Sequence, residues 1–224
     1  MRLIVALILL AITSILPANA TPFIERNIDH TTIRYAVPAG FVDLKTANPT
    51  VFERYRRMYL SKGTDVLSLF VPVHEAKLYE EFEKYFYVKI TNKRKNKSYS
   101  VRDFSSLRNE IRKELEHSSA DFYKGSDKSA NEALKKVRAG LSVRDGMVLG
   151  LILDESRSLS TVTASKVQTG SDAFIGLSSL AYVLLADKVV TFSAYRMLES
   201  PADIQRIEAD TVNWVRQSLQ ITNK

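Results

Sequence analysis

The sequence predicts an α+β fold, in which a mainly antiparallel sheet is covered by helices and a C-terminal helix packs on the sheet. Apolar runs of strand length, rich in β-branched and aromatic residues, recur between residues 31 and 197. Helical periodicity occurs near the middle and at the end of the chain instead of after every strand. With 45% hydrophobic residues, the chain is apolar enough to bury a core.

The first twenty residues have the pattern of a secretory signal peptide. Arg2 precedes the apolar stretch 3–16, and Ala18-Asn19-Ala20 supplies the small residues of a cleavage site. We expect cleavage after Ala20, which leaves residues 21–224 as a single α+β domain in the periplasm or outside the cell. An uncleaved anchor and a cytosolic protein are the alternatives, but the apolar stretch is shorter than the ~20 residues that span a bilayer.

Composition restricts the chemistry further. The chain has no cysteine, which excludes disulfides, thiol nucleophiles and cysteine-ligated zinc, and which fits a bacterial exported protein better than an animal one. The formal net charge is +7. In an exported protein this charge favours an acidic protein or an anionic envelope surface as partner over nucleic acid.

The first half of the mature chain is read as short strands and one helix. Residues 21–30 show little pattern and are predicted to be an irregular leader. Residues 31–44 form two short strands around a turn at Pro38-Ala39-Gly40. A short helix follows at 50–60, and the apolar run 65–73 is a strand.

The middle of the chain is expected to carry most of the helices. A short helix near residue 78 leads into a strand at 85–90, and residues 89–102 form a solvated loop with six positive charges. Ser100 and Asp103 match a capping box. The helix that they begin is expected to bury an apolar row, and a second short helix is expected at 130–139. The row consists of Phe104, Leu107, Ile111 and Leu115.

The last third is mostly strand and ends in a helix. Asp145-Gly146 predicts a hairpin turn within 141–155, and the polar run 156–169 predicts a solvent-facing strand. The runs 177–185 and 189–197 predict two buried strands joined at Asp187-Lys188. These two charges argue against a transmembrane span.

The final helix has well-marked starting signals. Ser200 can cap it, Pro201 suits its first turn, and Asp203 places a negative charge at the positive end of the helix dipole. Trp214, the single tryptophan, is expected to hold this helix against the sheet.

Three stretches together resemble a known fold. They are the strand pair "YAVPAGFVDL", the strand "VVTFSAYRML" and the closing helix "SPADIQRIEADTVNWVRQSLQ". In outline, residues 31–220 resemble the Mog1/PsbP-type α/β/α sandwich of small exported or accessory proteins, including secreted bacterial proteins without an assigned function. The resemblance implies a non-catalytic binding or assembly role.

The candidate binding residues come from the basic stretch. They are Lys93, Arg94, Lys95, Lys97 and Tyr99. Crowded like charges suit an anionic partner, and each contributes ~1 kcal/mol beside an anionic lipid surface. A mobile polar loop without a binding role is the alternative. Nucleic acid is disfavoured because stacking aromatic residues are sparse nearby.

No catalytic residue, metal ligand or cofactor site is predicted. His30, His74 and His117 match no metal-binding spacing, and the stretch 176–180 lacks the last glycine of a nucleophile elbow. Glycine-rich phosphate loops are absent from the sequence. We therefore expect an exported, non-enzymatic protein that binds another protein or an envelope surface. A hydrolase whose site assembles only in the fold, and a secreted factor acting on a host or competitor cell, are the alternatives.

The signal peptide generates the first testable prediction. The chain recovered from cells should begin at Thr21, because the export peptidase cuts after small residues at this spacing. N-terminal sequencing and intact mass measurement of the protein in each cell fraction check this. Recovery of the uncut, full-length chain from the cell interior would contradict it.

Overall fold

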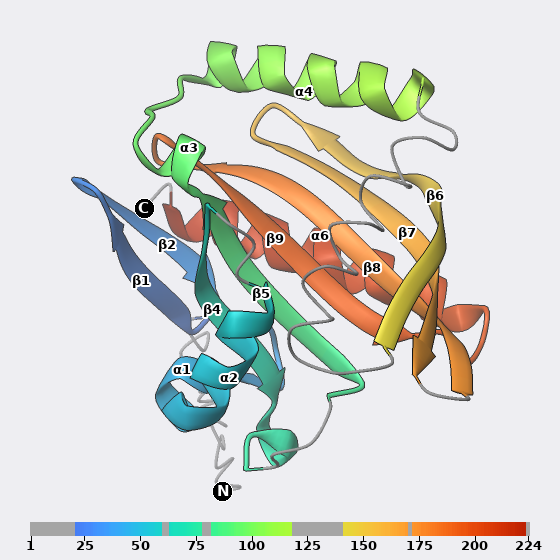
Figure 1. Cartoon of the computed structure of the whole chain (residues 1–224). Helices are drawn as coiled ribbons and strands as arrows, with labels where there is room; N and C mark the ends of the chain where they lie inside the picture. Colours follow the sequence, from blue (N-terminus) through green and yellow to red (C-terminus); the bar gives the residue numbers. More distant parts are fainter. Residues whose placement is uncertain (1–20, 60–62, 78–81, 118–140, 170–171, 223–224) are drawn as a thin grey trace, which may run out of the picture.

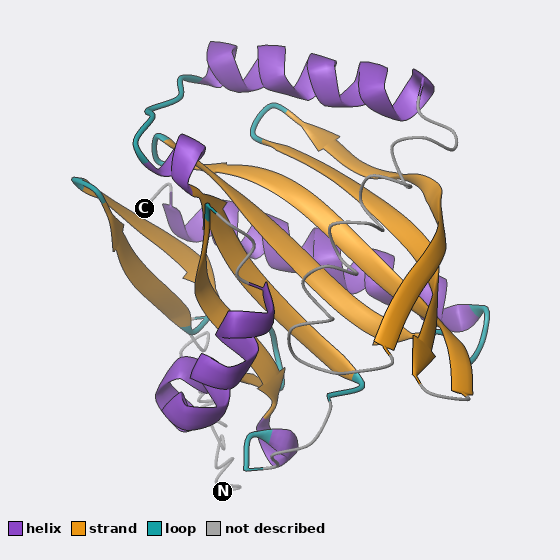
Figure 2. Cartoon of the chain, in the orientation of Figure 1, coloured by secondary structure: helices purple, strands orange, loops and turns teal. Residues whose placement is uncertain are grey.

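The computed structural model describes residues 21–59, 63–77, 82–117, 141–169 and 172–222. Its centre is a seven-stranded antiparallel sheet in the order β3-β4-β5-β9-β8-β7-β6 (Figures 1 and 2). The strands are β3 Phe41–Asp43, β4 Thr64–Pro72, β5 Lys84–Thr91, β6 Leu141–Glu155, β7 Ser158–Thr169, β8 Asp172–Leu185 and β9 Lys188–Met197. A separate hairpin pairs β1 (Phe23–Ile28) with β2 (Thr31–Ala36).

Helices lie on both faces of the sheet. They are α1 Leu44–Ala47, α2 Pro49–Tyr59, the 3-10 turn η1 Val73–Glu75, α3 Asn92–Lys95, α4 Val101–His117 and α6 Ala202–Thr222. The long helix α6 runs behind the sheet together with the β1–β2 hairpin, whereas α1, α2 and α4 lie on the opposite side (Figure 1). The predicted α+β class and the helix-covered antiparallel sheet are confirmed.

Trp214 is the centre of the largest core, between α6 and the sheet. Its ring centroid lies 5.9, 5.1 and 4.3 Å from those of Phe70, Phe86 and Phe192, which come from β4, β5 and β9. Its indole N–H donates to the backbone carbonyl of Ala36 at 2.8 Å, so the same side chain also holds β2. The expectation that Trp214 fastens the final helix to the sheet is confirmed.

Several predicted elements match the structure closely. The strands at 31–36, 41–43 and 64–72, the helix at 49–59 and the buried pair β8–β9 lie where the sequence placed them. The capping box is present, because the Asp103 carboxylate accepts the Ser100 amide N–H at 2.9 Å. Among the residues that the structure describes, no helix is long and apolar enough to cross a membrane.

Four predictions from the sequence are wrong. Residues 23–28 are a strand and not an irregular leader, because β2 supplies a partner for it. The stretch 141–155 is one continuous strand, and Asp145-Gly146 lies at a register shift against β7 instead of in a turn. The first half of β7 is buried and not solvent-facing. Residues 92–95 form α3, so the basic stretch is not wholly a loop.

The amphipathic helix α4 is less buried than expected. Phe104 is fully buried, while Leu107, Ile111 and Leu115 are half-buried. Its position on the sheet depends on ionic contacts as well, since Arg108 and Arg112 both pair with Asp154 at the end of β6. The helix expected at 130–139 lies outside the described residues.

Asp203 fixes the start of α6. Its carboxylate accepts the Ser200 amide N–H at 2.9 Å and pairs with Arg196 at 3.0 Å and with Arg206 at 3.1 Å. Burial opposes the charge of this carboxyl, but these hydrogen bonds and ion pairs hold the pKa of Asp203 well below its usual range. The ionised side chain therefore stabilises the folded state.

This gives a pH-dependent stability prediction. A depressed folded pKa contributes stability above the ordinary value of 3.8, and this contribution disappears as pH falls through the folded pKa. Asp203→Asn should therefore lower the thermal unfolding midpoint near neutral pH, and its difference from the unaltered protein should shrink in acid. Circular dichroism melts at several pH values measure both. Glu208→Gln, on the same helix, is the control, and a pH-independent difference would refute the mechanism.

Candidate functional site

The predicted binding residues lie together on one short stretch between β5 and α4. We call residues 93–99 the basic segment. Lys93, Arg94 and Lys95 belong to α3, and Lys97 and Tyr99 follow in the connection to α4 (Figure 1). The structure thus places all five predicted residues in α3 and the connection that follows it.

The turn between β8 and β9 holds the basic segment in place. The Tyr99 amide N–H donates to the Asp187 carbonyl oxygen at 2.8 Å, and the buried Lys188 amine donates to the Lys97 carbonyl oxygen at 3.5 Å. Burial disfavours the charge of Asp187, but hydrogen bonds from Ser98 and Thr31 hold the pKa of that carboxyl below its usual range. The segment is consequently attached through its backbone, with Lys93 and Lys97 exposed and Arg94 and Lys95 half-buried.

The aromatic ring of Tyr99 adds an apolar attachment. It packs beside Phe104, Leu184 and Val189, the small core beneath the start of α4. The Lys97 amine lies 4.8 Å from the centroid of the same ring. Tyr99 therefore anchors the segment to the core, and its predicted contact with a partner stays a prediction.

The four cations of the basic segment differ in the groups that they contact. Lys95 is paired with Asp65 at 2.7 Å. Arg94 lies 4.8 Å above the ring centroid of Tyr182, and Lys97 lies over Tyr99. Lys93 is exposed and forms no ion pair within the described part of the chain. Three of the four cations therefore form no ion pair with a described carboxylate.

Sequence reasoning missed the residues that extend this surface onto the sheet. Lys89 of β5 lies opposite Thr191 of β9, and Thr191 lies opposite Tyr182 of β8. The Lys89 amine is 5.4 Å from the ring centroid of Tyr87. Lys89 was visible as part of the charged stretch, but no local pattern could indicate that Tyr182, far along the chain, lies beside it.

The other candidate chemistries do not gather into a site among the described residues. His30 and His74 are exposed and lie beside their sequence neighbours Asp29 and Glu75. The stretch 176–180 lies within β8, where no strand-to-helix turn exists. No cluster of three potential metal ligands occurs in the described ranges.

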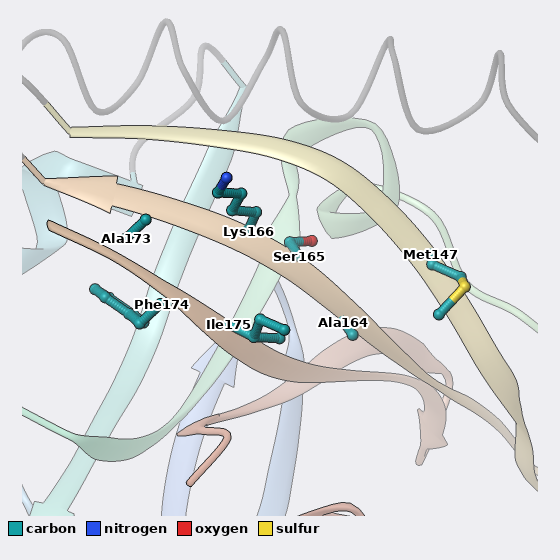
Figure 3. Close-up of a pocket in the computed structure, with 7 residues that line it drawn as sticks. All are labelled: Met147, Ala164, Ser165, Lys166, Ala173, Phe174 and Ile175. Carbon is teal, nitrogen blue, oxygen red and sulfur yellow. The ribbon is translucent and has the colours of Figure 1, made fainter.

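A shallow apolar cavity lies at the far end of β6, β7 and β8. Its volume is about 430 Å³, and its lining includes Met147, Ala164, Phe174 and Ile175 (Figure 3). Ile175 is seven residues along β8 from Tyr182, which corresponds to roughly 24 Å of strand. The cavity is therefore separate from the basic segment.

The attachment of the segment gives a prediction. Tyr99→Ala removes the ring from its apolar contacts, so the backbone amides of residues 93–99 should exchange with solvent at least about fivefold faster. Hydrogen–deuterium exchange with mass spectrometry measures this. Lys97→Ala removes the cation but keeps the ring, and it should leave exchange unchanged. Equal acceleration in both variants would show that the ring does not anchor the segment.

Comparisons with known proteins add a weak resemblance in fold. No protein family matches the sequence, and no curated protein matches it. Among solved structures, the cyanobacterial PsbP protein CyanoP from Synechocystis is similar at 12% identity and a TM-score of 0.44, over 87% of this chain and 91% of that one. A point variant of the protein Mog1 is similar at 12% identity and a TM-score of 0.33, over 89% and 88%. The chain thus weakly resembles the PsbP and Mog1 fold, in agreement with the expectation from its sequence.

Proposed function

We propose that this chain is an exported, non-enzymatic binding or accessory protein that captures an anionic partner through its basic segment. The partner is an acidic surface of another protein or an anionic envelope surface. One observation carries the proposal: the β8–β9 turn fastens the segment by its backbone and so presents cations from a fixed platform. A platform that is ordered before binding loses less conformational entropy when the partner docks.

The electrostatics of the segment support this role. Lys93, Arg94 and Lys97 lie within five consecutive residues, and none of them forms an ion pair with a described carboxylate. Cations at this spacing repel each other, and an opposing anionic surface relieves that repulsion. Each such residue contributes about 1 kcal/mol beside an anionic lipid surface. The net charge of +7 adds long-range attraction to the same kind of partner.

Export is supported by the sequence of the first twenty residues. The charge, apolar stretch and small-residue site come in the order that export signals use. Outside the cytoplasm, the anionic partners available to a basic protein are envelope lipids and acidic proteins. The proposed compartment and the proposed partner chemistry are therefore consistent with each other.

The test replaces the four cations by serine. Lys93, Arg94, Lys95 and Lys97 are changed together, and capture by native envelope fractions and by anionic vesicles is measured by co-sedimentation at low and high salt. We expect affinity at low salt to fall at least about tenfold. Lys95→Ser alone should have little effect, because Asp65 already neutralises that lysine.

The matched control removes the same charge elsewhere. Four exposed cations outside the segment are changed to serine, which lowers the net charge equally: Lys45, Arg57, Lys77 and Lys166. Capture by this control should remain within about twofold of the unaltered protein. Equal losses in both variants would mean that net charge alone acts, and unchanged capture in the segment variant would refute the proposal. Binding to envelope proteins but not to lipid vesicles would identify a protein partner.

A further inference from the structure

We propose that Lys89, Arg94 and Thr191 form a binding site for a phosphate monoester on the sheet face beside α3. This inference rests on the proposed function, because Arg94 belongs to both the basic segment and this phosphate site. It goes further by naming the chemical group that the surface recognises and by adding two residues from β5 and β9. The shared chemistry is a terminal, dianionic phosphate, whether on a lipid headgroup or on a soluble molecule.

The strand register brings these residues together. Lys89 lies directly opposite Thr191, and Thr191 lies directly opposite Tyr182. Directly paired residues of antiparallel strands point to the same face, and neighbouring strands are about 4.8 Å apart. Lys89 and Tyr182 therefore flank Thr191 in one row across three strands. Arg94 reaches this row from α3, with its guanidinium carbon 4.8 Å above the Tyr182 ring.

The row offers hydrogen-bond donors and positive charge without a described counterion. Neither Lys89 nor Arg94 forms an ion pair with a carboxylate in the described ranges, and the nearby Asp65 is paired with Lys95. Thr191 is 4% exposed, and its side chain forms no hydrogen bond with a described residue. Lys89 and Arg94 are half-buried cations beside the buried Thr191, each against a tyrosine ring, and an anion bound between them would relieve their mutual repulsion.

The geometry fits a phosphate better than a carboxylate. A guanidinium stacked on an aromatic ring keeps its N–H edge free for two oxygens of an anion. The ammonium of Lys89 and the hydroxyl of Thr191 can serve further oxygens, and a phosphate monoester has three terminal oxygens whereas a carboxylate has two. The dianionic charge of the monoester also matches the two cations.

The experiment uses inorganic phosphate as the probe. The full sequence is expressed, and the protein is purified in the form that is recovered from the cells. Phosphate binding is then measured by isothermal titration calorimetry and by NMR chemical shifts of the residues around Thr191. Lys89→Gln and Arg94→Gln should each weaken binding at least about tenfold, and Thr191→Val about threefold. Arg102→Gln removes one charge from the start of α4 and should change affinity less than about twofold. Thermal melts verify that each variant is folded.

The outcome separates this inference from the proposed function. Absence of saturable phosphate binding, or unchanged binding in Lys89→Gln, overturns the phosphate site. The proposed function is tested independently by measuring binding to vesicles in which oleate, a carboxylate, is the only added anion. Binding to phosphatidic acid vesicles is compared with binding to oleate vesicles of equal surface charge. If the protein prefers phosphatidic acid and Lys89→Gln removes that preference, the result supports the site and identifies a lipid headgroup as the ligand. If phosphate binding depends on Lys89 but the protein shows no preference for phosphatidic acid vesicles, the result supports the site and identifies a soluble phosphate as the ligand.

Discussion

The pairing of β9 with its two neighbours is the constraint on which the rest of the structure depends. β9 lies between β5 and β8, so it joins the two halves of the sheet. Its α6-side residues, Phe192 among them, contact Trp214, and its first residues form the turn that holds the basic segment. Ala186 in this turn has a φ of 51°, which costs a residue with a side chain about 1–2 kcal/mol. The extensive pairing of β8 with β9 outweighs that cost.

A buried polar cluster joins the β1–β2 hairpin to the sheet on the α6 side. Arg26 pairs with the buried Asp43 at 2.6 Å, and the Tyr35 hydroxyl lies 2.9 Å from that of Ser68. Removal of one member of such a cluster leaves the others buried without a partner, so the cluster specifies one position for the hairpin. Trp214 reinforces that position through the Ala36 carbonyl. The hairpin is therefore an integral part of the core and not an appendage.

Local signals in the sequence were sufficient where the structure depends on local interactions. The start of α6 followed from Ser200 and Asp203, and the β8–β9 hairpin from two apolar runs around a charged dipeptide. Prediction failed where a distant strand decides the outcome. Pairing with β7 overrides the turn propensity of Asp145-Gly146, and pairing with β2 orders residues 23–28. The basic segment was found from its charge, but its contact with Tyr182 depends on sheet register and has no local sequence signal.

The way in which the cations are held bears directly on what they do. A carboxylate that fixes a cation also neutralises it, as Asp65 does for Lys95. An aromatic ring fixes a cation through its quadrupole and leaves the formal charge in place, as Tyr182 does for Arg94 and Tyr99 for Lys97. Ordered cations that keep their charge lose less side-chain entropy on binding an anion than free ones do. The tyrosines around the segment are therefore consistent with the proposed recognition of an anion, because solubility alone needs charge but no fixed geometry.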